Sequence, residues 1–215
     1  MSNLDNELKM LRNNQLKKDD IFDFKCKACG KCCRRHDDII LTPYDLYEIA
    51  AKLEISVEKV VYDYCDRGIG EISQLPVVMV RRGKCAFLTK DGCILENRKP
   101  VNCRIYPLGR GFDDDKLVYF SQPVNCGDRN STQTVADWLE RNGVTEENEW
   151  FTVKWYELMS KLVMFIYKRK FSPCELEAFQ RALVPILYLC YRTDRNFYEQ
   201  LLDRYECLER IMREI

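Results

Sequence analysis

The densest cysteine run in the chain reads Cys26-Lys27-Ala28-Cys29-Gly30-Lys31-Cys32-Cys33, with four thiols in eight positions. Thiols this close together form disulfides or, as thiolates, hold a soft metal. In a C-x-x-C step the backbone turns between two sulfurs, so that both face a common centre, as in zinc knuckles and iron–sulfur loops. Gly30 suits such a turn because glycine tolerates a positive φ. We expect the amino-terminal half to be organised around this run.

Cys32 and Cys33 are adjacent, and we expect the side chains of such neighbours to diverge. A single metal ion would then use one of the two. The other would serve a second metal, a cluster edge or a buried wall. The sequence alone leaves open which of the two is the ligand.

The composition indicates a globular protein. The chain has 215 residues, of which 46% are apolar, which is enough for a substantial core in one or two domains. Lys and Arg together number 34, as do Asp and Glu. A zero net charge provides no general attraction to nucleic acid or to an anionic membrane. We therefore expect neither as a partner.

The amino terminus favours a cytoplasmic location, because residues 1–20 are polar and lack the apolar stretch of a secretory signal or membrane anchor. In a reducing compartment, the twelve cysteines indicate metal ligands or redox groups rather than disulfides. The single histidine, His36, argues against a mixed Cys/His finger. We expect His36 at the surface or behind the ligands, and a site dominated by thiolate.

A second cysteine group lies in residues 85–88, 91–95 and 103–107. The pair Asp91-Gly92 is a turn signal that would fold Cys93 back against Cys85. Tetrahedral Zn²⁺ takes four thiolates, and so does a 4Fe-4S cubane, for which C-x-x-C-x-x-C is a familiar three-ligand arm. The fourth ligand would come from this second group. The candidate metal ligands are Cys26, Cys29, Cys32, Cys33, Cys85, Cys93 and Cys103.

Seven thiols exceed the need of one site, so either two centres exist or some thiols only line the pocket. The metal could also be a structural staple for a loop-rich half. Cys126 is a further thiol of this half with no assigned role, whereas we expect Cys65 in the core. Arg34, Arg35 and Arg104 adjoin cysteines, where they could lower a thiolate pKa or simply be solvated.

Capping and periodicity predict the elements of the amino-terminal half. Helices are expected to begin at Thr42, with Asp45 completing a capping box, and at Ser56. Residues 3–18, with Leu4, Leu8 and Leu11, predict a short amphipathic segment. Strands are expected at 76–80, ending in a hairpin turn at 81–83, and at 116–120, with residues 67–74 as a loop. Phe22 and Phe24 are expected to pack beside the cysteines.

The carboxy-terminal part predicts a helical bundle. Helices are expected at 134–141 and 145–170, after the capping box that opens at Ser172, and after Asp194 as the last cap. Pro185 should kink or end its helix. The isolated cysteines of this part are expected to be small core residues. They are Cys174, Cys190 and Cys207.

The predicted fold class is therefore α+β and mostly helical. A cysteine-rich, metal-organised amino-terminal half with short strands should pack on a carboxy-terminal helical bundle. The expected division is a leader at 1–21, a cysteine cluster metal-binding domain at 22–130 and a helical region at 131–215.

The motifs of residues 22–110 resemble the YkgJ-type cysteine cluster (CxxCxxCC) family, which is described as zinc- or iron-chelating. The matching pattern comprises Phe24 with the first cysteine run, Cys85-x-Phe87-Leu88, Cys93-x-Leu95 and Lys99-Pro100-x-x-Cys103-Arg104-x-Tyr106-Pro107. The resemblance implies that the seven cysteines hold metal and that Arg104, Tyr106 and Pro107 shape the pocket or its loops.

The same domain occurs in flagellin lysine N-methylases, which are thought to use an iron–sulfur centre with S-adenosylmethionine. The leading function is thus metal binding, as an iron–sulfur cluster or zinc. The resemblance implies a lysine N-methyltransferase-like enzyme as one alternative, with S-adenosylmethionine as cofactor and a protein substrate. The others are a redox module with labile ligands and a metal-stapled interaction scaffold, whose specificity would lie after residue 130.

Overall fold

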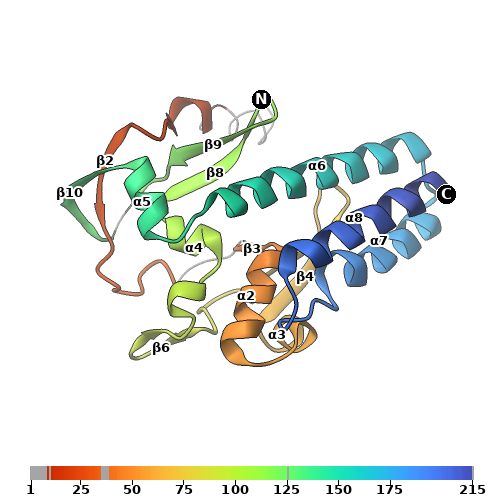
Figure 1. Cartoon of the computed structure of the whole chain (residues 1–215), viewed down its shortest axis with the longest axis horizontal. Helices are drawn as coiled ribbons and strands as arrows, with labels where there is room; N and C mark the ends of the chain where they lie inside the picture. The colour runs from red at the N-terminus through yellow and green to blue at the C-terminus, as the bar shows by residue number, and fades with distance from the viewer. Residues whose placement is uncertain (1–8, 10, 35–38, 125, 215) are drawn as a thin grey trace.

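The computed structural model describes residues 9, 11–34, 39–124 and 126–214, and every structural statement below refers to these. The fold is α+β and mostly helical, as predicted. Short strands gather in the amino-terminal part, and the long helices α6 (Glu146–Arg169), α7 (Pro173–Tyr188) and α8 (Phe197–Glu214) form the carboxy-terminal part (Figure 1). No helix in this described part of the chain combines the length and apolar character needed to cross a bilayer.

Two small antiparallel sheets frame the amino-terminal part. In the first, β1 (Gln15–Leu16), β9 (Lys116–Ser121) and β8 (Leu108–Asp113) lie in that order. In the second, β2 (Ile21–Lys25) pairs with β10 (Asp128–Thr134) and leads straight into the first cysteine run. The acidic turn before residue 116 is confirmed between β8 and β9. Of the predicted amphipathic segment, Leu4 and Leu8 lie outside the described residues, and Leu11 is helical.

The third sheet has the order β3 (Ile40–Leu41), β5 (Pro76–Val80), β4 (Cys65–Ile69) and is joined by two helices. Helix α2 (Pro43–Leu53) begins with the predicted capping box of Thr42 and Asp45. Helix α3 (Val57–Tyr64) begins with the predicted Ser56 cap. The expected strand at 76–80 is also confirmed.

Two expectations around this sheet are wrong. Residues 65–69 form β4 rather than belonging to a loop from residue 67, because the backbone of β5 supplies antiparallel partners along their whole length. The turn at 81–83 makes no hairpin. Strand β5 is the central strand, paired on one edge with β3 and on the other with β4, so no edge is left for the chain that follows.

The next segment carries the second cysteine group. Strands β6 (Leu88–Thr89) and β7 (Gly92–Cys93) form a tight hairpin whose turn includes the predicted Asp91-Gly92 pair. A 3₁₀ turn, η1 (Glu96–Arg98), and a short helix, α4 (Val101–Ile105), follow.

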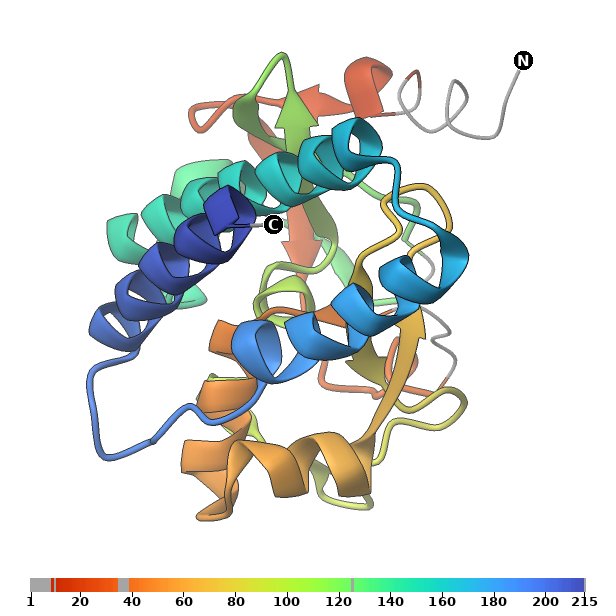
Figure 2. The same cartoon turned by 90° about the vertical axis from the view of Figure 1, so that its right-hand side faces the viewer.

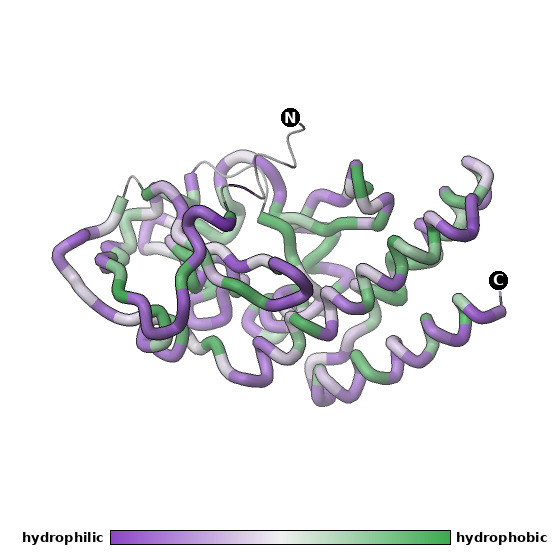
Figure 3. The backbone as a smooth tube through the Cα atoms, turned by 90° about the horizontal axis from the view of Figure 1, so that it is seen from above, coloured by the Kyte–Doolittle hydropathy of each residue, from purple (hydrophilic) through white to green (hydrophobic). Residues whose placement is uncertain are grey.

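The predicted carboxy-terminal helices are confirmed. Helix α5 (Val135–Arg141) and α6 begin with capping boxes at Thr134 and Thr145, and α7 begins with the capping box at Ser172. Helix α7 runs through Pro185 and ends only at Tyr188. Helices α6, α7 and α8 run beside one another in both views (Figures 1 and 2). Hydrophobic and hydrophilic residues alternate along α8, as expected for a helix with one buried face (Figure 3).

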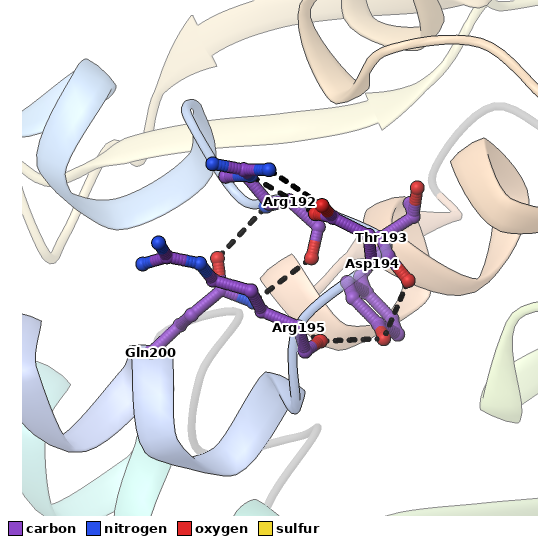
Figure 4. Close-up of polar contacts among 6 residues, drawn as sticks. Arg192, Thr193, Asp194, Arg195 and Gln200 are labelled. Atoms are coloured by element: carbon purple, nitrogen blue, oxygen red, sulfur yellow. Dashed lines mark hydrogen bonds and ion pairs between the residues drawn. The ribbon is translucent and has the colours of Figure 1, made fainter.

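The last helix does not start where the sequence suggests. Asp194 pairs with Arg192 through an ion pair (Figure 4). The capping role belongs to Asn196, whose Oδ1 accepts from the backbone N–H groups of Tyr198 and Glu199 over 2.8 and 3.2 Å. The predicted cap at Asp194 is therefore wrong by two positions.

The isolated cysteines are also less buried than expected. Cys174 and Cys190 are exposed, and Cys207 is half-buried, so the prediction of core positions is wrong for the first two. Cys174 lies in the first turn of α7, and Cys190 follows the helix's last turn, where the chain leaves the core. Cys65 is buried, as predicted.

Two hydrophobic cores hold the fold together. The larger core includes α2, α3 and β5 residues together with Phe151, Leu158 and Leu162 of α6 and further residues of α7 and α8, so the helical part packs on the amino-terminal part. The smaller core surrounds Phe24 and Trp138 and includes α4, β9 and α5. The cysteine loops lie between elements of these two cores.

Candidate metal centre

The first cysteine loop begins directly after β2. The backbone N–H of Ala28 points at the sulfur of Cys26 over 3.4 Å, and the N–H of Cys33 donates to the carbonyl of Gly30 over 3.1 Å. Ala28 and Gly30 have φ values of 51° and 65°. The chain therefore turns around the C-x-x-C step with N–H groups facing sulfur, and Gly30 has the positive φ that was predicted.

The second loop is fixed to the core through Phe87. Its ring is 1% exposed and stacks on Tyr64 with 5.0 Å between centroids. The backbone N–H of Leu88 donates to the carbonyl of Cys85 over 3.1 Å, and Cys93 lies opposite Leu88 in the β6–β7 hairpin. The hairpin thus turns Cys93 back toward the segment that carries Cys85.

A backbone hydrogen bond joins the two loops. The N–H of Cys85 donates to the carbonyl oxygen of Cys33 over 3.0 Å. A side-chain contact supports it, because a Cβ built on Gly30 would lie 3.3 Å from Leu88 Cδ1. The two cysteine motifs, far apart in sequence, therefore touch.

Cys103 is held by the amino-terminal end of α2. It lies in α4, whose first N–H, that of Val101, donates to Asp45 Oδ1 over 2.9 Å. The other oxygen of this buried carboxylate accepts from the N–H and the hydroxyl of Thr42, over 2.9 and 2.7 Å. Asp45 thus caps α2 and anchors α4 at the same time.

Charge effects connect the inner thiols of both loops. Burial raises the pKa of Cys103, and the charge of Asp45 raises it further. Charges on Cys85 and Cys93 add to the same shift. Effects of this kind are largely screened beyond roughly 10 Å, so these thiols face one volume. We call them, together with a fourth thiol whose pKa they also raise, the inner set: Cys33, Cys85, Cys93 and Cys103.

A second group of thiols forms around Cys126. Burial raises the pKa of Cys126, whereas its contact with the Tyr106 hydroxyl, over 4.0 Å, works in the opposite direction. Charges on the three most exposed thiols of the first loop raise that pKa as well. We call this group the outer set: Cys26, Cys29, Cys32 and Cys126.

Aromatic rings support the outer set. Burial and the neighbouring Cys126 raise the pKa of Tyr106 to about 12. Its ring meets that of Phe24 edge to face, at 6.1 Å between centroids. Gly127 packs so closely on Phe24 that a Cβ would clash with the ring. Phe24 therefore lies beside the cysteines as predicted, and Phe22 contacts Trp138 instead.

Cys32 and Cys33 link the two sets, and their side chains do not diverge as expected. Their sulfurs are 3.8 Å apart and share a hydrogen bond. This bond lowers the pKa of Cys33 and raises that of Cys32. A separation of about 3.8 Å equals the sulfur–sulfur edge of a tetrahedron with zinc–sulfur bonds of about 2.3 Å. Both sulfurs can thus approach one ion.

All twelve cysteines lie within the described residues, and each is a free thiol. Among these residues, no three cysteine, histidine, aspartate or glutamate side chains form a ready-made ligation geometry. The donor set nevertheless suits a soft cation. Several thiols that raise one another's pKa become thiolates together only when positive charge is brought among them.

The arginines beside the cysteines differ in their surroundings. Arg104 donates through Nη1 to the carbonyl oxygens of Asn142 and Gly143 over 3.2 and 2.9 Å, and its buried Nε has no hydrogen-bond partner in the described structure. Arg104 therefore supports the loop after α5. Arg34 is exposed. Arg35 and His36 lie outside the described residues.

The structure adds two residues that the sequence did not single out for the site. Cys126 was noted without a role, and its signal was only its count as a further thiol in the same half. Asp45 was predicted as a helix cap, and nothing in the sequence indicates its bond to α4. The last implied pocket residue, Pro107, follows α4 directly and precedes β8.

Comparison with known proteins agrees with the chemistry of these loops. A family model described as "CxxCxxCC: Putative zinc- or iron-chelating domain" matches residues 25–131. This range contains both thiol sets and all seven predicted ligands. A search of curated proteins and a search of solved structures each found no match to the chain.

Proposed function

The chain belongs, through residues 25–131, to the CxxCxxCC family of zinc- or iron-chelating domains, and on this premise we propose that its cysteine thiolates bind zinc or an iron–sulfur cluster. The observation that carries the proposal is the contact between the two loops, in which the N–H of Cys85 bonds the carbonyl of Cys33. It brings enough thiols together to supply the four that either centre requires.

The inner set would provide the first centre. Its support is the backbone tie between the loops and the anchoring of α4 by Asp45, which hold three separate segments around one volume. The four sulfurs of the inner set are half-buried. A centre here would be shielded from solvent and would tie the larger core to the loops.

The outer set would provide a second centre nearer to solvent. Three of its thiols are exposed, and Cys126 reaches them from the segment before β10. The N–H of Ala28 that faces Cys26 is the kind of donor that stabilises thiolate ligands. Cys32 adjoins the inner set through its sulfur contact with Cys33. Two centres would also use all eight thiols of this half.

The chemistry would depend on what is bound. Zinc with four thiolates has no open position and acts as a staple, whereas an iron–sulfur cluster carries electrons. In either case the residues of this chain supply negative sulfurs and backbone N–H donors, and they exclude water on the inner side. The inner centre, with its half-buried ligands, suits the staple, and the exposed outer set suits exchange or electron transfer.

The partition into two centres is tested by counting metal. Cys103→Ser should remove the inner centre and Cys126→Ser the outer one, so each variant should hold less metal per chain than the unchanged protein. The double variant should hold almost none. If Cys126→Ser keeps the full metal content while Cys103→Ser loses all of it, one centre is present and the outer set is not a ligand group.

The same preparations test the methylase alternative implied by the resemblance. Calorimetric titration of the metal-loaded protein with S-adenosylmethionine should give no saturable heat if metal binding is the whole function. Saturable binding that disappears in Cys126→Ser would support an enzyme whose outer centre contacts the cofactor.

A further inference from the structure

A groove of about 430 Å³ opens at the surface beside the joined cysteine loops. Three basic side chains line it, with one aliphatic residue and one hydroxyl residue between them. The lining residues are Arg34, Lys84, Leu88, Thr89 and Lys90. We refer to this surface as the basic groove.

The basic groove is built from the same backbone as the candidate metal centre. Arg34 directly follows Cys33, and Lys84 directly precedes Cys85. The hydrogen bond from Cys85 to Cys33 therefore fixes these two cations on one side of the junction. Lys90 lies in the turn of the β6–β7 hairpin. The half-buried Leu88, which packs against Gly30, separates the cations with an apolar surface.

The charge of this region stands out in a chain whose net charge is zero. Residues 25–35 contain five basic residues and no acidic one, and residues 81–90 contain four basic residues and no acidic one. Neighbouring cations are paired, for example Lys27 with Asp128 and Arg81 with Asp66. Within the described part of the chain, no carboxylate forms an ion pair with the three cations of the groove.

We propose that the basic groove binds an acidic segment of a partner protein and seats it beside the thiol loops. Three cations around an apolar side chain complement a peptide that carries several carboxylates and one aliphatic residue. A nucleic acid fits less well, because the lining has no aromatic ring on which a base could stack. That the partner faces a metal rests on the proposed function, whereas peptide binding itself does not.

The test uses the full chain and a fluorescent oligoglutamate peptide with a central leucine as probe, followed by anisotropy at low and at physiological salt. The test variant is R34Q/K84Q/K90Q. The matched control, K168Q/R210Q/R213Q, removes the same charge from exposed positions on α6 and α8. Neutralising the three exposed cations of the groove should weaken binding about tenfold. The control should bind like the unchanged chain, and binding should weaken with salt.

The single variant K90E provides a second measurement at a turn position remote from the loop junction, and it should also weaken binding. Equal affinity of the test and control variants would overturn the proposal. So would competition by inorganic phosphate or by oligothymidylate that matches competition by the unlabelled peptide. Metal content is measured on the same samples. Peptide binding by a protein that holds no zinc or iron would sustain this inference and refute the proposed function, and the converse result would do the opposite.

Discussion

The backbone N–H of Cys85 donates to the carbonyl oxygen of Cys33 over 3.0 Å, so two cysteine motifs from distant parts of the chain meet at one hydrogen bond. Each motif reaches this junction from a different scaffold. The first follows β2, which the smaller core holds through Phe24, and the second is anchored by Phe87 in the larger core. The junction is therefore where the two cores are connected through the thiols.

Removing a carboxylate behind the site should weaken both the fold and the metal centre. Asp45→Asn takes away charge-assisted bonds to Thr42 and Val101 in a buried place, and should lower the free energy of unfolding by roughly 2–4 kcal/mol. It should also lower metal content, because α4 carries Cys103. Asp137→Asn is the matched control, since Asp137 holds the same capping-box position on α5 at the surface. Urea denaturation that gives equal losses for both would contradict the anchoring role of Asp45.

The aromatic anchor of the second loop gives a further prediction. Phe87→Ala removes a fully buried ring that stacks on Tyr64, and should cost about 3–5 kcal/mol of unfolding free energy. Metal affinity should fall with it, because the ring positions Cys85. Phe112→Ala, which loses a stack on Tyr156 outside both cores, should cost less and leave metal affinity unchanged. Chelator competition measures the affinity, and an unaltered value for Phe87→Ala would count against the anchor.

The start of α8 can be tested by a pair of substitutions. Asn196→Ala removes the side chain that accepts from Tyr198 and Glu199, and should cost about 1 kcal/mol. Asp194→Ala removes only an exposed ion pair with Arg192 and should leave thermal stability unchanged. A larger drop in melting temperature for Asp194→Ala than for Asn196→Ala would show that the helix begins earlier.

A thiol variant tests the first loop directly. Cys29→Ser should lower metal content and solubility together, because it removes a ligand from the C-x-x-C turn. Cys174→Ser changes an equally exposed thiol on α7, and should alter neither. Metal analysis and the soluble fraction are measured on both. If Cys29→Ser behaves like Cys174→Ser, Cys29 is not a ligand.

Much of the fold could be predicted from local signals. Hydroxyl caps followed by acids or amides three residues later mark the starts of α2, α5, α6 and α7, because these patterns satisfy the first backbone N–H groups of a helix without outside help. The hairpin at Asp91-Gly92 is equally local. The apolar stripe of α6 predicts its buried residues because a helix of this length shows its period clearly.

The features that sequence did not predict depend on contacts between distant segments. Strand β4 contains Arg67 and Gly68 and has no apolar alternation, and it is extended because β5 pairs with it. Asp194 and Asn196 are both good caps, and the choice between them follows from the loop before α8, where the Tyr47 hydroxyl bonds the carbonyls of Thr193 and Arg195. Figure 4 shows this loop.

For the site, the sequence indicated which thiols to examine and the structure indicates how they group. Spacing in the first run predicts a metal loop, yet it does not reveal that Cys126 joins that loop or that Cys32 and Cys33 have adjacent sulfurs. Both facts arise from the placement of β10 and of the turn before Cys33. The division into leader, cysteine domain and helical region stays a prediction.

The central claim is that the two cysteine loops share an inorganic centre, and the most direct test is metal and acid-labile sulfide analysis of the full chain purified without oxygen. We predict zinc, or iron with sulfide, at a content that falls when Cys85 is changed to serine. A preparation that holds neither zinc nor iron, with the thiols fully reduced and the chain folded, would contradict the account.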